Sequence, residues 1–158
     1  MSHYTPVLNV LRGHFGGRLR AVVLFGSQAR GEASPVSDHD LFVVADDLPL
    51  DLFARDRELR LILMPILAQL PGSISFVART PTELLANLSP LMVDVCVDGV
   101  CLYGQGFFEP LRRKALEALR AAGLSRQRIA GTLMWVFPQA RTTNWTLDWD
   151  GFKIHDRV

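Results

Sequence analysis

The sequence predicts an α/β (α+β) domain in which helices flank a small mixed sheet, and three observations support this class. Of the 158 residues, 49% are hydrophobic, which is enough to bury one sizeable core. Residues 19–25 and 39–44 are apolar runs without alternation, a pattern typical of strands that are covered on both faces. Segments with helical periodicity and helix-start signals lie before and after these runs.

The remaining elements follow from caps, turns and periodicity. A Thr-Pro pair at residues 5–6 opens a first helix, which a Gly-Gly pair ends before the first strand. Residues 51–70 have helical periodicity, with a kink expected at Pro65. Residues 73–78 alternate in polarity and predict a strand, with Ser75 on one of its faces. Further elements are expected at 80–88 (a helix with a capping box), from 89 (a helix), at 99–103 (a strand), at 109–122 (a helix) and at 125–136 (a helix).

The chain is expected to divide near residue 104. Residues 1–104 hold every strand of the predicted main sheet, whereas residues 105–158 predict a helical C-terminal extension. Beyond Pro138 the composition shifts to Thr, Asn, Trp and Asp, and an Asp-Gly pair at residues 150–151 predicts a terminal hairpin. We expect the tryptophans to pack against the core or form a partner interface, which leaves a homo-oligomer open.

Charge and cysteine content exclude several classes of protein. Lys and Arg number 17 and Asp and Glu 16, so no broad basic surface for general nucleic-acid binding is expected. The chain has two cysteines, Cys96 and Cys101, which are too few for a disulfide framework and lack the spacing of a zinc motif. No segment reaches the ~20 apolar residues of a membrane span, and the first residues lack the pattern of a secretory signal. We therefore expect a cytoplasmic protein without membrane association.

Two groups of polar residues lie at the ends of the predicted strands and indicate a binding or catalytic site. The first strand ends at Gly26-Ser27, where backbone N–H groups and a hydroxyl can bind phosphate and glycine allows a close approach. Asp38 and Asp40 open the next strand two residues apart, so their carboxylates share one face and can hold a hard cation such as Mg²⁺. His39 points to the other face, where we expect it to pack. A carboxylate pair beside a phosphate site suits metal-assisted phosphoryl transfer.

The spacing of these residues resembles the signature of a known family. Gly26, Ser27 and Gly31, followed by Ser37-Asp38-x-Asp40-Leu41, are similar to the motif of minimal nucleotidyltransferases in the DNA polymerase beta superfamily. The resemblance covers about residues 20–104 and implies a polymerase beta-like nucleotidyltransferase fold. It also implies a nucleoside triphosphate and Mg²⁺ or Mn²⁺ bound at Gly26, Ser27, Ser37, Asp38 and Asp40. Arg30 either contacts the triphosphate or is solvated, because arginine suits both roles.

One expected residue is absent from this pattern. Active members of the family usually carry a third aspartate on the following strand, and Ser75 stands where that aspartate would fall. Serine is a poor metal ligand and a weak base, so we expect this change to impair catalysis more than nucleotide binding. Glu83, Asp94 or Asp98 could supply the missing charge, although no spacing rule places any of them at the site.

The predicted function is therefore Mg²⁺-dependent transfer of a nucleoside monophosphate from a triphosphate, with ATP the expected donor, to a hydroxyl acceptor. Asp38 and Asp40 are the predicted catalytic and metal-binding residues. The sequence does not identify the acceptor, but small members of the family resemble components of two-protein modules in which they modify a helical partner of the HEPN type. A tyrosine or other hydroxyl on such a partner is one candidate acceptor. The alternative is a nucleotide-binding regulator, or antitoxin-like binding partner, that has lost turnover because of Ser75. A purely structural adaptor is a third hypothesis, which requires the whole motif to be vestigial.

Overall fold

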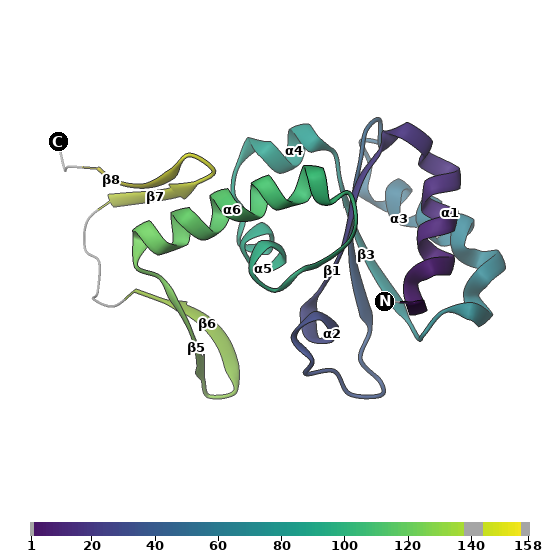
Figure 1. The fold of residues 1–158 in the computed structure, drawn as a ribbon, viewed down its shortest axis with the longest axis horizontal. Helices are drawn as coiled ribbons and strands as arrows, with labels where there is room; N and C mark the ends of the chain where they lie inside the picture. Colours follow the sequence, from purple (N-terminus) through teal and green to yellow (C-terminus); the bar gives the residue numbers. More distant parts are fainter. Residues whose placement is uncertain (1, 138–143, 156–158) are drawn as a thin grey trace.

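The computed structural model describes residues 2–137 and 144–155 and shows helices packed on both faces of a central sheet (Figure 1). Its helices are α1 (Thr5–Phe15), α2 (Gly26–Arg30), α3 (Leu52–Leu63), α4 (Pro81–Ala86), α5 (Pro90–Asp98) and α6 (Gln105–Ala122), with 3-10 turns at Ser2–Tyr4, Gly16–Arg18 and Met64–Gln69. Its strands are β1 (Leu19–Phe25), β2 (His39–Ala45), β3 (Ile74–Arg79), β4 (Val100–Tyr103), β5 (Ser125–Ile129), β6 (Thr132–Val136), β7 (Asn144–Asp148) and β8 (Gly151–His155).

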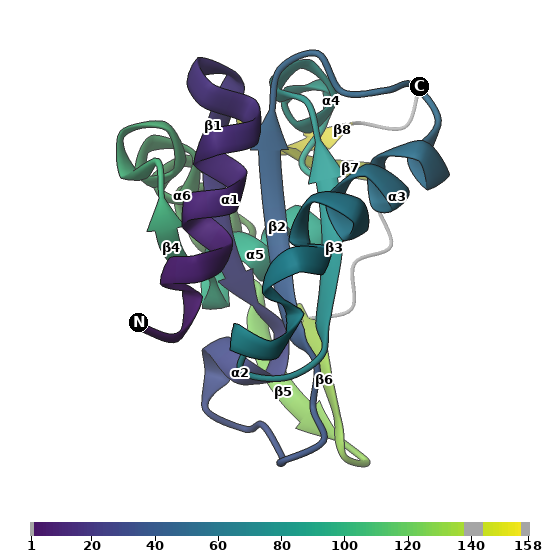
Figure 2. The same ribbon diagram turned by 90° about the vertical axis from the view of Figure 1, so that its right-hand side faces the viewer.

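The central sheet is mixed, as the sequence predicts. Its strand order is β3-β2-β1-β4, with β2 parallel to β3 and the other two pairs antiparallel. Helices α1 and α3 cover one face and α5 and α6 cover the other, as the two views of the ribbon show (Figures 1 and 2). The predicted fold class is therefore confirmed. Among the described residues, no helix is long and apolar enough to cross a membrane.

The two central strands determine which side chains face which helices. Both strands are buried along most of their length, which agrees with the unbroken apolar runs in the sequence. On β2, Leu41 and Val43 belong to the core beneath α1 and α3, whereas Phe42 and Val44 belong to the core beneath α5 and α6. Because side chains alternate along a strand, Asp40 lies on the α5 and α6 side and His39 on the α1 side.

Two caps read from the sequence form the expected contacts, whereas Thr5 is the first residue of α1 and no side chain caps that helix. Thr80 and Glu83 make a reciprocal capping box at the start of α4, and the Ser89 hydroxyl accepts a hydrogen bond from Met92 N at the start of α5. The predicted kink at Pro65 is a change from α-helix to a 3-10 turn. Helix α6 begins earlier than predicted, because the carbonyl of Gly104 accepts the N–H groups of residues 107 and 108 and adds a turn before the proline.

The C-terminal extension differs from the prediction of a helical segment. Residues 125–136 form the β5–β6 hairpin and not a helix, so the part of the extension that the structure describes consists of α6 followed by two hairpins. The hairpin closes through Ala130 and Gly131, both with positive φ (49° and 82°), the backbone of a tight hairpin turn. The predicted terminal hairpin is confirmed as β7–β8, although Asp148 pairs with Gly151 and its loop is therefore residues 149–150.

Candidate active site

The two predicted metal-binding acids lie at the start of β2, at one end of the central sheet. Asp40 pairs with Phe25 at the end of β1 and with Ser75 at the start of β3. Asp38 precedes the strand by one residue. The chain turns directly from β1 into α2 at Gly26, so the predicted phosphate-binding turn and the two acids meet at the same end of the sheet.

Gly26 lies directly against the carboxylate of Asp40. A Cβ atom added at residue 26 would overlap Oδ2 of Asp40, so any other residue would displace the acid or the turn. Gly26 also has a φ of 70°, a conformation that residues with side chains rarely adopt. This glycine is thus required twice, by its backbone conformation and by its contact with the acid. The contact joins the predicted phosphate-binding turn to the acid pair.

The electrostatic environment of the acids favours a bound cation. Burial raises the pKa of Asp40 and the neighbouring charge of Asp38 raises it further, while Arg30 and His39 act in the opposite direction. A divalent cation would offset both the cost of burying the Asp40 charge and the repulsion between the two carboxylates. The oxygen donors of the two aspartates therefore fit Mg²⁺ or Mn²⁺. Within residues 2–137 and 144–155, no group of three or more His, Cys, Asp or Glu residues could hold a metal.

Ser75 occupies the position predicted for the missing acid. It is the direct register partner of Asp40 in the parallel β2–β3 pair, and alternation puts both side chains on the α5 and α6 side. Of the acids that could replace it, Glu83 lies beyond the opposite end of β3 and forms an ion pair with Arg55 at 2.6 Å. The third carboxylate is therefore not supplied from α4.

Ser37, which the motif includes among the phosphate-binding residues, has a structural contact in this conformation. Its hydroxyl accepts a hydrogen bond from Ser34 N (2.9 Å) and lies 3.1 Å from the Ser34 hydroxyl, which closes the turn before Asp38. Gln28 of α2 lies over the same turn, because its Nε2 is 3.4 Å from both the Ser37 carbonyl and His39 Nε2. Sequence reasoning missed Gln28, whose place inside a variable part of the motif gives no signal.

His39 connects the acid strand to the N-terminal segment. Its Nδ1 lies 2.7 Å from the hydroxyl of Tyr4, a residue that is only 6% exposed. The ring therefore packs on the face opposite to the aspartates, which confirms the prediction that it points away from them. Burial raises the pKa of Tyr4, so its phenol stays neutral and hydrogen-bonded.

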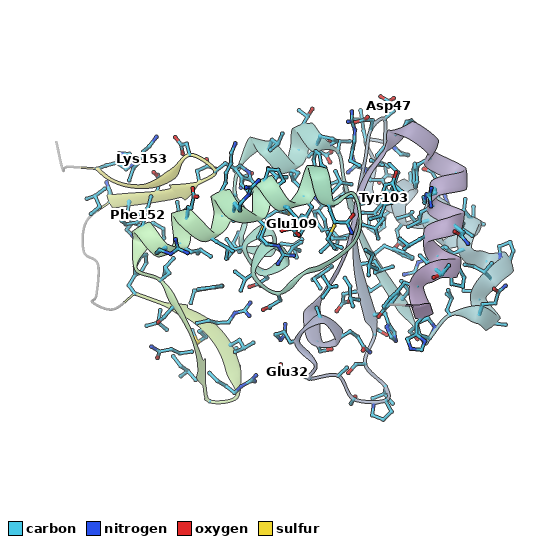
Figure 3. All side chains as sticks on the ribbon, in the orientation of Figure 1. Glu32, Asp47, Tyr103, Glu109, Phe152 and Lys153 are labelled. Carbon is cyan, nitrogen blue, oxygen red and sulfur yellow. The ribbon has the colours of Figure 1, made fainter. Side chains whose placement is uncertain are left out.

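Arg30 is neither free in solvent nor unpaired. Its Nε donates to Glu32 (3.0 Å) and its Nη1 lies 3.6 Å from Asp98 at the end of α5. The side chain of Arg30 is 27% exposed, so it remains partly accessible to solvent. Figure 3 shows Glu32 beneath α2, on the side that faces the β5–β6 hairpin.

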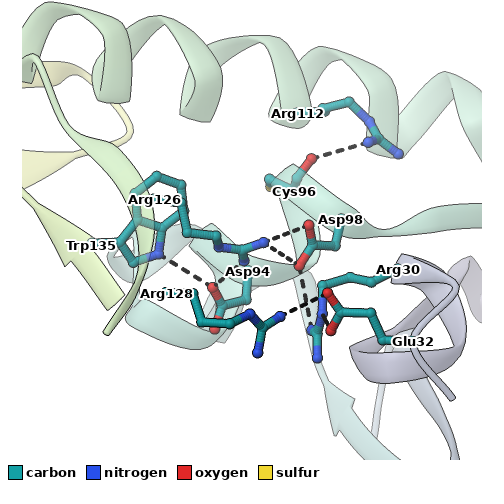
Figure 4. Close-up of polar contacts among 9 residues, drawn as sticks. All are labelled: Arg30, Glu32, Asp94, Cys96, Asp98, Arg112, Arg126, Arg128 and Trp135. Carbon is teal, nitrogen blue, oxygen red and sulfur yellow. Dashed lines mark hydrogen bonds and ion pairs between the residues drawn. The ribbon is translucent and has the colours of Figure 1, made fainter. Parts of the chain in front are cut away.

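The β5–β6 hairpin reaches the same region from the C-terminal extension. Arg128 pairs with Glu32 at 2.9 Å, and Arg126 donates to Asp94 and to both oxygens of Asp98 (Figure 4). Burial lowers the pKa of Arg126, but the hydrogen bonds that it donates to Asp98 and Asp94 outweigh burial and leave the pKa raised. Sequence reasoning missed these arginines because it predicted a helix here, although Arg126 and Arg128 alternate with the spacing of one strand face.

The fold and the site together define a nucleotidyltransferase class: a mixed sheet, a glycine-serine turn after one strand and two acids that open the next. Residues 9–104 match the sequence model of the family described as Polymerase beta, Nucleotidyltransferase. This match covers more than half of the chain, and the chain therefore belongs to that family, whose members transfer nucleotidyl groups.

Two relatives from Methanocaldococcus jannaschii are similar in sequence. The first, named "Putative protein adenylyltransferase MJ1305", is 34% identical over 95 residues, which are 60% of this chain and 65% of the relative. The second, MJ0604, has the same descriptive name and is 40% identical over 48 residues, which are 28% of this chain and 48% of the relative. The matched part of this chain thus spans less than two thirds of either relative.

Two solved toxin–antitoxin structures are similar in fold. A toxin–antitoxin crystal structure with AMP-PNP has a TM-score of 0.52 and 27% identity, and the match covers 75% of this chain and 87% of that chain. A double Asp-to-Glu mutant of the toxin–antitoxin MntA-HpeT has a TM-score of 0.51 and 25% identity, with 74% and 86% of the two chains covered.

Proposed function

We propose that this chain binds a nucleoside triphosphate, with ATP as the donor, and transfers its nucleoside monophosphate to a hydroxyl group of a partner protein. The observation that carries the proposal is the contact between Gly26 and the carboxylate of Asp40. It places the turn that would bind phosphate against an acid that would bind the metal, and phosphoryl transfer needs both at one point.

Each residue of the motif has a role in this proposal. The backbone of Gly26 and the hydroxyl of Ser27 bind phosphate, and Arg30 adds a positive charge that the triphosphate shares with Glu32. Asp38 and Asp40 hold Mg²⁺ or Mn²⁺, which when bound stabilises the charge that develops on the transferred phosphate.

The acceptor is proposed from the names of the similar proteins. The relatives named as adenylyltransferases act on proteins by name, and the toxin–antitoxin structures pair two proteins, one of them in the presence of an ATP analogue. These names support a protein as the acceptor. The HEPN-type helical partner, with a tyrosine or other hydroxyl on it as the acceptor, is proposed from the resemblance of the motif to small nucleotidyltransferases of two-protein modules. The cytoplasm, which supplies ATP and Mg²⁺, is the compartment that this reaction needs.

A second function is favoured by Ser75. Its register with Asp40 leaves two carboxylates where the family pattern has three, which removes a ligand and a candidate proton acceptor. A chain with this site would still bind a nucleotide and could regulate a partner through binding alone. Nucleotide binding is common to both functions, and turnover separates them.

The two functions are tested by label transfer. The chain is mixed with ATP labelled on the α-phosphate, Mg²⁺ and a helical protein encoded by a neighbouring gene, and label on protein is measured. Transfer that is lost in Asp38→Asn and Asp40→Asn but retained in Asp47→Asn supports the enzyme. Asp47 is a matched control because it is exposed near the other end of β2 and has a φ of 56°, which asparagine tolerates.

Other outcomes have equally definite meanings. ATP binding in calorimetry without label transfer supports the regulator and rejects the enzyme. If the wild-type chain does not bind ATP with Mg²⁺, both functions are rejected.

A further inference from the structure

A cluster of charged residues links the β5–β6 hairpin to the candidate nucleotide site. It consists of three arginines and three acids drawn from α2, the segment after α2, α5 and β5 (Figure 4): Arg30, Glu32, Asp94, Asp98, Arg126 and Arg128. The two hairpin arginines lie outside residues 9–104, the segment that matches the family. Their contacts are therefore a feature of this chain's own extension.

Asp98 is the shared member of this cluster. Both of its carboxylate oxygens accept hydrogen bonds from Nη1 of Arg126 at 2.7 Å, whereas Arg30 lies farther away at 3.6 Å. The side chains of Asp98 and Arg126 are 12% and 17% exposed, so solvent screens their interaction little. Asp98 thus pairs mainly with the hairpin arginine and only weakly with Arg30.

Arg126 is held in this position by two further contacts. Its guanidinium lies over the ring of Trp135, 5.1 Å from the ring centroid, and its Nη2 donates to Asp94 at 2.9 Å. The indole Nε1 of Trp135 donates to the same carboxylate at 3.3 Å. Arg126 therefore has a fixed orientation, with one edge on Asp94 and the other on Asp98.

The arrangement has a consequence for Arg30. Without the charge of Arg126, the partly buried carboxylate of Asp98 would have Arg30 as its nearest cation and would bind it as an ion pair. A guanidinium engaged in this way loses part of its attraction for a triphosphate. We propose that Arg126 is a positioning residue for the nucleotide: it neutralises Asp98 and so leaves Arg30 available to the triphosphate. This inference rests on the proposed function, in which the triphosphate binds beside Gly26 and Ser27.

The test measures the affinity for ATP with Mg²⁺ by calorimetry in four proteins: wild type, Arg126→Gln, Asp98→Asn and the double variant. Arg126→Gln should weaken ATP binding by about tenfold, the scale of one charge-assisted hydrogen bond. Asp98→Asn should bind at least as tightly as wild type, because Arg30 then loses one of its two acidic partners and only Glu32 still competes with the triphosphate for it. The double variant should return to within about twofold of wild type, since additivity fails when two residues act through one contact.

A merely structural role gives a different pattern. If Arg126 only attaches the hairpin, both single variants remove the same contact, and Asp98→Asn would weaken ATP binding with no rescue in the double variant. Trp135→Phe is the matched control, because it removes the hydrogen bond to Asp94 and keeps the charge of Arg126 and a ring beneath it. Its ATP affinity should equal that of wild type, and a loss as large as that of Arg126→Gln would overturn the proposal.

Two readouts keep the result interpretable. Melting temperatures report whether each variant folds, and Asp98→Asn alone can overturn the inference if Arg126→Gln does not fold. Wild type that fails to bind ATP rejects the proposed function and the inference with it. Wild type that binds ATP, with an unaffected Arg126→Gln or an unrescued double variant, rejects the inference alone.

Discussion

Restoring the third carboxylate is the most direct perturbation of the site. In Ser75→Asp the new side chain lies next to Asp40, because the two residues are register partners in neighbouring strands, which are ~4.8 Å apart. Asp40 already has a raised pKa from burial and from the charge of Asp38. A third acid therefore adds repulsion in the absence of metal and a third ligand in its presence.

The size of the effect follows from the spacing of the charges. Two like charges about 5 Å apart at a partly exposed site repel by about 1–3 kcal/mol. For a chain of this length, that repulsion lowers the melting temperature of the metal-free variant by about 3–10 °C. Mg²⁺ should reverse the loss, and the turnover measured by label transfer should rise by about tenfold or more, as one added electrostatic contact to a transition state can provide.

The assay compares Ser75→Asp with Ser75→Asn, which has nearly the same shape and no charge. Thermal unfolding is recorded with and without Mg²⁺, and label transfer is measured under the same conditions. Mg²⁺ should raise the melting temperature of the Asp variant more than that of the Asn variant. Equal responses of the two variants, with no gain in label transfer, would show that residue 75 does not face the metal site.

Three further predictions concern stability and the site. Gly26→Ala should abolish ATP binding in calorimetry and lower the free energy of unfolding in denaturant by about 1–3 kcal/mol, because its Cβ would overlap Asp40 and φ is positive. Unchanged binding would show that ATP does not need the contact between this turn and Asp40. Hydrogen bonds from Arg55 lower the pKa of Glu83 from 4.5 to about 2, so this stabilisation is complete above pH 4.5 and is lost as the pH falls toward 2. Because Glu83 is 38% exposed, screening reduces the contribution to about 1–2 kcal/mol. The free energy of unfolding, measured from pH 7 to 2, should therefore fall less steeply with pH in Glu83→Gln than in wild type. Gly104→Ala should lower the melting temperature by several degrees without changing ATP affinity, because Gly104 has a φ of 82° and a Cβ atom there would overlap backbone atoms of Arg20. An unchanged melting temperature would show that the backbone at residue 104 can shift to accept the side chain.

Most elements of the sheet domain could be predicted from the sequence, because the sequence signals for those strands and helices are local. Buried strands are continuous apolar runs, and helix starts carry capping residues such as Thr80 and Ser89, so both can be recognised without tertiary information. The position of Ser75 opposite Asp40 was predictable for the same reason. Alternation fixes the face of each residue once the strand is recognised.

The contacts around the hairpin could not be predicted in this way. Residues 125–136 have no Asn-Gly or Asp-Gly turn, and the hairpin closes through Ala130, which rarely adopts a positive φ. The ion pairs of Arg126 and Arg128 join residues that are 28 to 96 positions apart. No short-range pattern encodes such pairs, and the role of the extension becomes visible only in three dimensions.

The hydrogen bond between Tyr4 and His39 bears on how the protein is prepared for experiments. His39 lies between the two aspartates of the motif, yet its ring contacts the turn that precedes α1. Trimming the chain through Tyr4 therefore removes a partner of the acid strand, although the change lies far from the site in sequence. Activity measured on such material should be compared with that of the untrimmed chain before any loss is attributed to Ser75.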